Sequence, residues 1–377
     1  MNVMKVSKTI APTQWMTAPE TVKVMDILNT GSDTPKALFV GGSVRHVLTG
    51  EEVTDIDIAT RHTPEQVQDL FKGTEVKIIP TGIDHGTVTA VINKRTFEIT
   101  TLRKDIETDG RRAVVAYTDS WLEDANRRDF TMNTLLMDAA GNIYDPTGQG
   151  IDDLTAGKVI FVGTPAERIA EDYLRILRFF RFHALYGQGA PDATALSACT
   201  AAADKILTLS RERITQETVK ILKSERFVSV LDLMAENSIL NIFPDADRGI
   251  LSPKQSLAAK LYTLNATEKY LIIPKALKRE MKAITEVMAL APLTTDQTIK
   301  VALYKQGRDA TRQAFLIQTT KNPTDQNIDE VLELINMWQI PTFPTTGEDL
   351  IAQGYKPGPE LGRKLKQKEE QWIKAGF

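Results

Sequence analysis

The strongest constraint on the fold of this chain is a change of pattern near residues 150–165. Before this point, short apolar runs such as residues 37–40 alternate with segments of helical character. From about residue 166 onward, apolar residues recur at helical spacing, and many prolines divide the sequence into helices of moderate length. The sequence therefore predicts an α+β fold, in which an α/β head is followed by an all-α body.

Local signals place individual elements within the predicted head. A helix is predicted over residues 43–48, and another begins at Thr63, where a possible N-cap is followed by a proline and then by Gln66. Residues 104–118 are polar and charged, and they predict a mobile or irregular loop. Strands are predicted over residues 37–40, 54–60, 75–80, 86–93 and 96–102.

Length, cysteine content and charge limit the class of protein. The 377 residues are enough for two or three domains of about 150 residues each. Cys199 is the single cysteine, which excludes an intrachain disulfide and a multi-cysteine metal centre and favours a reducing, cytoplasmic compartment. We find no targeting segment and no membrane-spanning apolar run. The net charge of -3 restricts any nucleic-acid binding to local basic patches.

The segment Gly41-Gly42-Ser43-Val44-Arg45 joins a predicted strand to a predicted helix. Paired glycines let the backbone approach a ligand closely, and the free N–H groups at a helix start suit a phosphate. Arg45 adds a charged donor one turn inside the helix. We interpret the segment as a phosphate-binding turn, and the alternative is a purely structural turn.

Asp55 and Asp57 follow this turn and flank Ile56. On a strand, positions i and i+2 point to the same face, so the two carboxylates lie side by side. They repel each other unless a cation lies between them, and a divalent ion such as Mg²⁺ prefers oxygen ligands of this kind. The pair predicts a metal site, with a solvated strand face as the alternative.

Two further clusters carry polar groups at helical spacing. Residues 127–133, Arg-Arg-Asp-Phe-Thr-Met-Asn, contain donors and acceptors suited to a triphosphate and ribose hydroxyls, although a capped helix start with surface arginines gives the same pattern. In the second cluster, Asp172 and Arg175 match the edge shared by cytosine and adenine, an amino donor beside a ring-nitrogen acceptor. Uracil and guanine present the opposite pattern. The alternative for Asp172 and Arg175 is an ordinary i, i+3 helix ion pair.

In this order, the four segments resemble the motifs of a known family. Gly41–Arg45 with Asp55–Thr60, Arg127–Asn133 and Glu171–Arg175 look like motifs A, B and D of the class II tRNA nucleotidyltransferases, that is, the CCA-adding enzymes and their poly(A) polymerase relatives. Asp145–Gly148 with residues 152–154 looks like motif C, and residues 211–222 are similar to the basic helical segment that follows. The resemblance covers residues 37–225. It implies a nucleotidyltransferase head over residues 1–160, a helical neck and body over residues 161–250 and a helical, tRNA-binding tail over residues 251–377.

The resemblance also implies roles for residues of the head. Asp55 and Asp57 match the catalytic carboxylates that bind the metal cofactor, Mg²⁺. Gly42 and Arg45 match nucleotide contacts near the phosphates. Glu98 is a candidate third acidic residue on the strand that precedes the polar loop.

Further matches concern the ribose and the base. Arg128 and Asp129 match the ribose-sensing motif. Asp172 and Arg175 match the amino-acid template that reads C and A. Residues 104–115 match a flexible loop that helps such enzymes switch from C to A. Two further nucleotide contacts are Arg178 and Arg181.

The chain departs from the family pattern at two places. His46 stands where the family usually has Asp after Val-Arg, which affects a helper interaction of motif A but leaves the carboxylate pair intact. Motif C is one residue longer than usual, through Gln149-Gly150. Some family members carry a C-terminal phosphohydrolase domain with His-Asp metal ligands, and this chain is expected to lack it because no histidine follows His183.

The resemblance predicts an enzyme that adds C and A to the 3′ end of tRNA from CTP and ATP. Its expected partners are tRNA and the two triphosphates, with no DNA and no membrane. A partial activity, adding CC only or A only, stays open, as does a poly(A) polymerase, which would be expected to lack the Glu-Asp-x-x-Arg template and to be more basic. A small-molecule nucleotidyltransferase would not need the long helical body, and a non-catalytic RNA-binding protein would not need Asp55 and Asp57.

Overall fold

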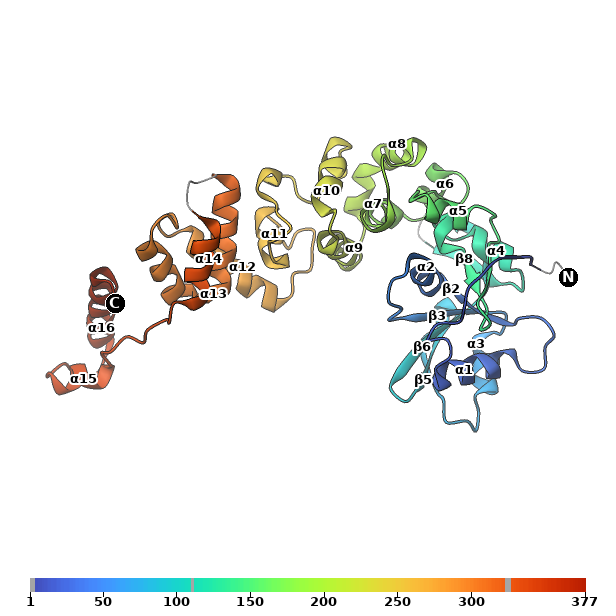
Figure 1. Cartoon of the computed structure of the whole chain (residues 1–377), viewed down its shortest axis with the longest axis horizontal. Helices are drawn as coiled ribbons and strands as arrows, with labels where there is room; N and C mark the ends of the chain where they lie inside the picture. Colours follow the sequence, from blue (N-terminus) through green and yellow to red (C-terminus); the bar gives the residue numbers. More distant parts are fainter. Residues whose placement is uncertain (1–3, 110–111, 323–326) are drawn as a thin grey trace. The chain divides into compact units, whose positions relative to one another are not determined.

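The structure is a computed structural model that describes residues 4–109, 112–322 and 327–377. The chain forms two compact units. The first contains residues 1–226 and 234–239, and the second contains residues 227–233 and 240–377. Figure 1 labels the elements of both. The three-part division at residues 160 and 250 stays a prediction.

The first unit is built on a mixed eight-stranded sheet with the order β1-β10-β9-β2-β3-β6-β5-β4. The neighbours β3 and β6 run parallel, and the other neighbouring pairs run antiparallel. All five predicted strands are confirmed, with small shifts at their ends. The strands are β1 (Val6–Thr9), β2 (Ala37–Val40), β3 (Ile56–Thr60), β4 (Lys77–Gly82), β5 (Thr87–Ile92), β6 (Arg95–Thr101), β9 (Leu136–Met137) and β10 (Asn142–Tyr144).

The burial of the strands follows from their sequences. In β5, Val88, Ala90 and Ile92 are buried while the intervening residues are partly exposed, as expected of a strand with one covered face. Strand β2 is buried at every residue, because it lies in the middle of the sheet. Strand β3, which bears the catalytic candidate Asp57 and directly follows Asp55, is therefore paired with a buried neighbour.

Helices complete the first unit (Figure 1). The capping box predicted for Thr63 and Gln66 is present at the start of α3, where each side chain satisfies the backbone N–H of the other residue. The change to helices after residue 165 is also confirmed. The α-helices are α1 (Pro19–Asn29), α2 (Gly42–Thr49), α3 (Pro64–Leu70), α4 (Trp121–Asn126), α5 (Gly150–Thr155), α6 (Pro165–Glu171), α7 (Leu174–Tyr186), α8 (Ala193–Ala201) and α9 (Arg211–Lys223), and the 3₁₀ turns are η1 (Ile83–His85), η2 (Thr131–Asn133) and η3 (Ala203–Thr208).

The prediction of an irregular loop over residues 104–118 is wrong for the described backbone. Strands β7 (Arg103–Asp109) and β8 (Arg112–Tyr117) pair antiparallel, with Arg103 opposite Tyr117. The charges and the glycine suggested a loop, but an antiparallel ladder needs only backbone pairing, and residues 113–117 include strand-forming Val and Tyr. Residues 110 and 111 lie outside the described part of the chain.

The regular elements of the second unit are all helices among the residues that the structure describes in it. Its core joins α11 to α14, and Gly307, with φ of 78°, interrupts the regular geometry of α13. No helix among the described residues has both the length and the apolar character needed to cross a membrane. The elements are α10 (Phe227–Glu236), whose last residues belong to the first unit, η4 (Arg248–Ile250), α11 (Leu257–Thr263), α12 (Lys275–Met288), α13 (Asp296–Lys321), α14 (Ile328–Met337), α15 (Gly347–Ala352) and α16 (Pro359–Ala375).

The backbone of Gly141 contacts the segment after β1, so a side chain at this position should destabilise the fold. Gly141 has φ of +86°, its carbonyl accepts from the Ile10 N–H at 3.0 Å, and an added Cβ would lie 2.3 Å from the Ile10 carbonyl oxygen. We expect Gly141→Ala to lower the free energy of unfolding by about 2–4 kcal/mol, because it combines backbone strain with a steric clash.

The matched control is Gly148→Ala. Gly148 also has positive φ, +73°, but an added Cβ would meet no atom within 4 Å. Gly148→Ala should therefore lower the free energy of unfolding by only about 1–2 kcal/mol, through backbone strain alone. Urea unfolding of both variants measures the difference, and equal losses would contradict the assigned contact.

Candidate active site

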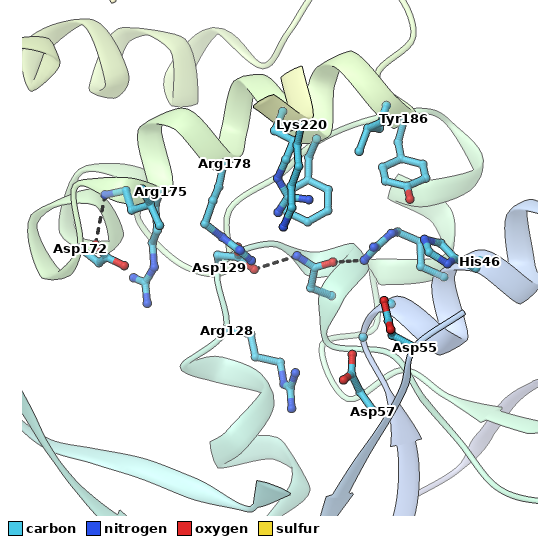
Figure 2. Close-up of a pocket in the computed structure, with 18 of the residues that line it drawn as sticks. His46, Asp55, Asp57, Arg128, Asp129, Asp172, Arg175, Arg178, Tyr186 and Lys220 are labelled. Carbon is cyan, nitrogen blue, oxygen red and sulfur yellow. Dashed lines mark hydrogen bonds and ion pairs between the residues drawn. The ribbon is translucent and has the colours of Figure 1, made fainter. Parts of the chain in front are cut away.

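One cavity of about 620 Å³ in the first unit brings the predicted site residues together. Figure 2 shows Asp55 and Asp57 on one side of it, facing Arg175 and Arg178 on the other. All ten residues that the sequence predicts for the site line this cavity: Gly42, Arg45, Asp55, Asp57, Arg128, Asp129, Asp172, Arg175, Arg178 and Arg181.

The turn between β2 and α2 passes directly over Asp57. Gly41 has φ of +63°, and a Cβ added at Gly42 would lie 3.7 Å from Asp57 Oδ2. The Ser43 hydroxyl accepts from the Asp57 N–H at 3.0 Å and donates to the Asp55 carbonyl at 3.2 Å. Sequence reasoning treated Ser43 only as part of the turn. In the structure its buried side chain fixes the turn against the backbone of both aspartates.

The carboxyl group of Asp57 has a raised pKa. Burial raises the pKa of Asp57 to about 6, and the charges of Glu98 and Asp55 add to the rise, while Arg128 and Arg45 oppose it. Glu98 lies opposite Asp57 in the parallel register of β3 and β6, so the candidate third acidic residue lies beside the pair. Among the described residues, no hydrogen bond offsets the negative charge of Asp57.

These carboxylates fit a hard divalent cation. No group of three or more His, Cys, Asp or Glu side chains in the described ranges forms a complete metal cage. Mg²⁺ does not require one, because it is commonly held by one or two carboxylates together with substrate phosphates and water. The unpaired charge of Asp57, beside the exposed Asp55, supplies the oxygen ligands of such a site.

A buried network of hydrogen bonds starts at Asp129. Its Oδ2 accepts from Arg178 Nε at 2.6 Å, and its Oδ1 accepts from Asn133 Nδ2 at 2.8 Å. Asn133 Oδ1 in turn accepts from Arg45 Nη1. Although burial opposes ionisation, the Arg178 charge and these hydrogen bonds hold the pKa of Asp129 below its ordinary value. Asp129 lines the cavity, but both of its oxygens have protein partners (Figure 2).

Sequence reasoning missed Asp124, which holds Arg128 in place. Asp124 Oδ2 accepts from Arg128 Nε at 3.0 Å and Nη2 at 2.8 Å, and its Oδ1 accepts from Arg127 Nε at 3.0 Å. Arg127 and Arg128 follow Asp124 at spacings i+3 and i+4, so the sequence contained a signal for both ion pairs. The alternative of a helix that starts at residues 127–133 is wrong, because Arg127 and Arg128 follow the end of α4 and only the short turn η2 comes after.

The alternative of an i, i+3 helix ion pair between Asp172 and Arg175 is wrong. Asp172 has extended backbone between α6 and α7, and its Oδ1 accepts from the Leu174 N–H at 3.1 Å. Its Oδ2 pairs with Arg213 Nη2 at 2.7 Å, whereas Arg175 Nη1 pairs with Glu171 Oε2 at 2.5 Å. Because the helix breaks at Asp172, only Arg175 and the later arginines lie on α7.

The cavity wall includes further residues. Arg181 lines the cavity and pairs with the buried Glu217 at 2.5 Å. Arg213 and Lys220 come from α9, the basic segment noted in the sequence, and Tyr186 lies one turn after Phe182 on α7. Burial and the Arg45 charge lower the pKa of His46, whose Nε2 is 3.6 Å from Glu51 Oε2.

Motif C lies outside the cavity, as far as the described residues show. Asp145 and Asp153 of motif C do not line the cavity, and Asp153 Oδ2 accepts from the Thr131 hydroxyl at 2.7 Å, which supports η2. The side chains of residues 105–115, to which the resemblance assigns the switch from C to A, lie outside the described part of the chain.

Comparison with known proteins agrees with this architecture. The family model "Poly A polymerase head domain" matches residues 37–160, and "Probable RNA and SrmB-binding site of polymerase A" matches residues 191–250. The CCA tRNA nucleotidyltransferase 1, mitochondrial, of Homo sapiens is 33% identical over 368 residues, which cover 90% of this chain and 83% of the relative. The CCA-adding enzyme of Streptococcus gordonii is 32% identical over 360 residues, covering 89% and 88%.

A solved structure shows the same fold. The crystal structure of the Bacillus stearothermophilus CCA-adding enzyme in complex with CTP has a TM-score of 0.76 at 24% identity, and covers 95% of this chain and 93% of that chain. The fold and the carboxylate-bearing cavity thus define a nucleotidyltransferase head joined to a helical region. The relatives then specify the group: the chain belongs to the family of CCA-adding enzymes, the CCA tRNA nucleotidyltransferases, as the motifs predicted.

The raised pKa of Asp57 generates a prediction about stability. The folded-state value of about 6 exceeds the ordinary value of 3.8, so the ionised group destabilises the fold above pH 6, and the cost disappears as pH falls toward 4. In metal-free protein, Asp57→Asn should therefore be more stable than wild type at pH 8, by about 1–3 kcal/mol, and the gain should shrink at pH 5.

Thermal melts in the presence of a chelator at both pH values measure this effect. Asp55→Asn is the matched control and should gain less, because the Asp55 side chain is exposed. A gain for Asp57→Asn that is independent of pH would contradict the assigned burial of charge.

Proposed function

We propose that this protein adds C and A nucleotides to the 3′ end of tRNA without a nucleic-acid template, from CTP and ATP. The observation that carries the proposal is that the acidic pair and the proposed base-reading residues, Asp172 and Arg175, line one cavity in a member of the CCA-adding family. In the reaction, the terminal 3′ oxygen of the RNA forms a bond to the α-phosphorus of the triphosphate. The bond to the β-phosphate oxygen breaks, and pyrophosphate leaves.

Asp55 and Asp57 are the proposed ligands of Mg²⁺. When bound, the metal would help to deprotonate the attacking hydroxyl and stabilise the leaving oxygens. The protein itself supplies position and charge. Gly42 leaves room for phosphate oxygens above Asp57, and the guanidinium groups of Arg45 and Arg128 lie on the same wall. Positioning and charge stabilisation supply most of the catalysis in transfers of this kind.

Base selection is assigned to Asp172 and Arg175. The Asp172 carboxylate accepts from the exocyclic amino group of C or A, and the Arg175 guanidinium donates to the neighbouring ring nitrogen. Each residue is oriented by its own partner, Asp172 by Arg213 and Arg175 by Glu171. Two separately held groups keep a fixed spacing, which is what selection by hydrogen bonding requires. Arg178 and Arg181 are proposed as further contacts of the nucleotide.

The RNA partner is proposed to be tRNA, held by its shape and phosphates rather than by its sequence. We assign the head to residues 1–160, the neck and body with the base template to residues 161–250, and the tail that contacts tRNA to residues 251–377. We also place the reaction in the cytoplasm, where a reduced Cys199 is stable; this cysteine is buried.

One assay separates this function from its alternatives. Purified protein is incubated with tRNA lacking its 3′ end and with labelled CTP, then ATP. Addition of two C and one A supports the proposal, and incorporation of CC only or A only identifies a partial activity. Long tracts of A would identify a poly(A) polymerase, the alternative suggested by the name of the matching head model. No incorporation would contradict an enzymatic role.

The acidic pair generates the first functional prediction. Asp55→Ala and Asp57→Ala should each abolish nucleotide transfer without unfolding the protein, because these side chains serve the metal rather than the core. Asp69→Ala is the control, since this exposed carboxylate lies outside the cavity. If either site variant kept activity within about tenfold of wild type, which is about 1.4 kcal/mol in the barrier, the metal assignment would be wrong.

Arg175→Ala should reduce discrimination between bases. The substitution removes one donor and should cost about 1–3 kcal/mol of discrimination, while contacts to the phosphates stay intact. Incorporation of UTP or GTP should therefore rise relative to CTP and ATP. Steady-state incorporation of all four triphosphates, read beside the melting temperature, tests this. A lower melting temperature with an unchanged preference ratio would assign Arg175 to structure alone.

A further inference from the structure

Tyr186, the last residue of α7, contacts the guanidinium group of Arg45 on α2. Arg45 Cζ lies 4.8 Å from the centroid of the Tyr186 ring and 5.0 Å from that of Phe182. The two rings are 6.1 Å apart and nearly parallel, with an interplanar angle of 28°. With Asn133 accepting from Nη1, three side chains surround one guanidinium group.

These contacts fix the direction of a flexible side chain. An arginine loses considerable rotamer freedom when it is held in one orientation, so a donor that is already held binds an anion at lower entropic cost. Arg45 is only 7% exposed, yet it lines the cavity, so its guanidinium group is held at the cavity wall. The aromatic faces supply this restraint without using any of the N–H groups.

Tyr186 is in turn held by its hydroxyl group. This group donates to Glu51 Oε2 at 3.4 Å, and the same oxygen lies 3.6 Å from His46 Nε2. Tyr186 and His46 lie on the same side of the cavity (Figure 2). The hydroxyl group binds Glu51 rather than Arg45, and its hydrogen bond is long and exposed, so the ring carries the restraint on Arg45.

We propose that Tyr186 is a positioning residue, whose ring holds Arg45 in the orientation that binds the triphosphate. The inference rests on the proposed function, because Arg45 needs this orientation only if a triphosphate occupies the cavity. A residue that served core packing alone would affect folding, but its effect on nucleotide affinity would not depend on Arg45.

Calorimetric titration of the full-length protein with CTP tests the proposal. Tyr186→Leu, which removes the aromatic face, should weaken CTP binding by about fivefold to thirtyfold. Tyr186→Phe keeps the ring and should stay within about twofold of wild type. Tyr117→Leu makes the same chemical change at an exposed tyrosine outside the cavity and should have no effect. If Tyr186→Leu does not fold, Tyr186→Met provides the same comparison with a flexible side chain of similar length.

A double-mutant cycle with Arg45→Met decides whether Tyr186 acts through Arg45. In the Arg45→Met background, Tyr186→Leu should cause no further loss of CTP affinity. Equal losses in both backgrounds, wild-type affinity of Tyr186→Leu, or a loss in Tyr186→Phe as large as in Tyr186→Leu would each overturn the inference while leaving the proposed function in place. Failure of the wild-type protein to bind CTP would instead overturn the proposed function, and the inference with it.

Discussion

The ion pair between the buried Asp129 and the half-buried Arg178 is the interaction on which the cavity depends. It joins the segment after α4 to α7, and through Asn133 the same carboxylate also restrains Arg45 on α2. Three elements from distant parts of the sequence thus meet at one side chain. Removing one partner of such a pair commonly costs about 3–5 kcal/mol, because the other charge stays buried. The arrangement fixes arginine positions that single surface contacts would leave variable.

The cavity is electrostatically divided, and each half suits a different part of a metal–triphosphate complex. The arginines of α7 line one wall, whereas Asp55 and Asp57 lie opposite them (Figure 2). Negative charge predominates on the side of Asp57, because burial and the charges of Glu98 and Asp55 raise its pKa although Arg128 and Arg45 oppose the rise. The free protein therefore carries a charge separation that a cation and a polyanion together would neutralise. Local fields of this kind are compatible with a net charge of only -3.

Sequence alone predicted what depends on short-range patterns. The capping box at Thr63, the strand predicted over residues 54–60 and ten of the residues that line the cavity follow from spacing or from the resemblance. The ion-pair partner of each charged residue did not follow from the sequence. Glu171 and Asp172 are adjacent acids near Arg175, and only the break between α6 and α7 decides which of them it binds. The β7–β8 hairpin was missed because charge was given more weight than backbone pairing.

The hydroxyl group of Ser43 fixes the distance between two segments of the cavity wall. It joins the turn after β2 to the backbone of the strand that bears the carboxylates, at 3.0 and 3.2 Å. The distance from this turn to the segment that carries Asp55 and Asp57 is therefore set by main-chain atoms and one short, buried side chain. Because no long side chain bridges the two segments, substitutions on the neighbouring helices are expected to leave the separation of the turn and the two aspartates unchanged.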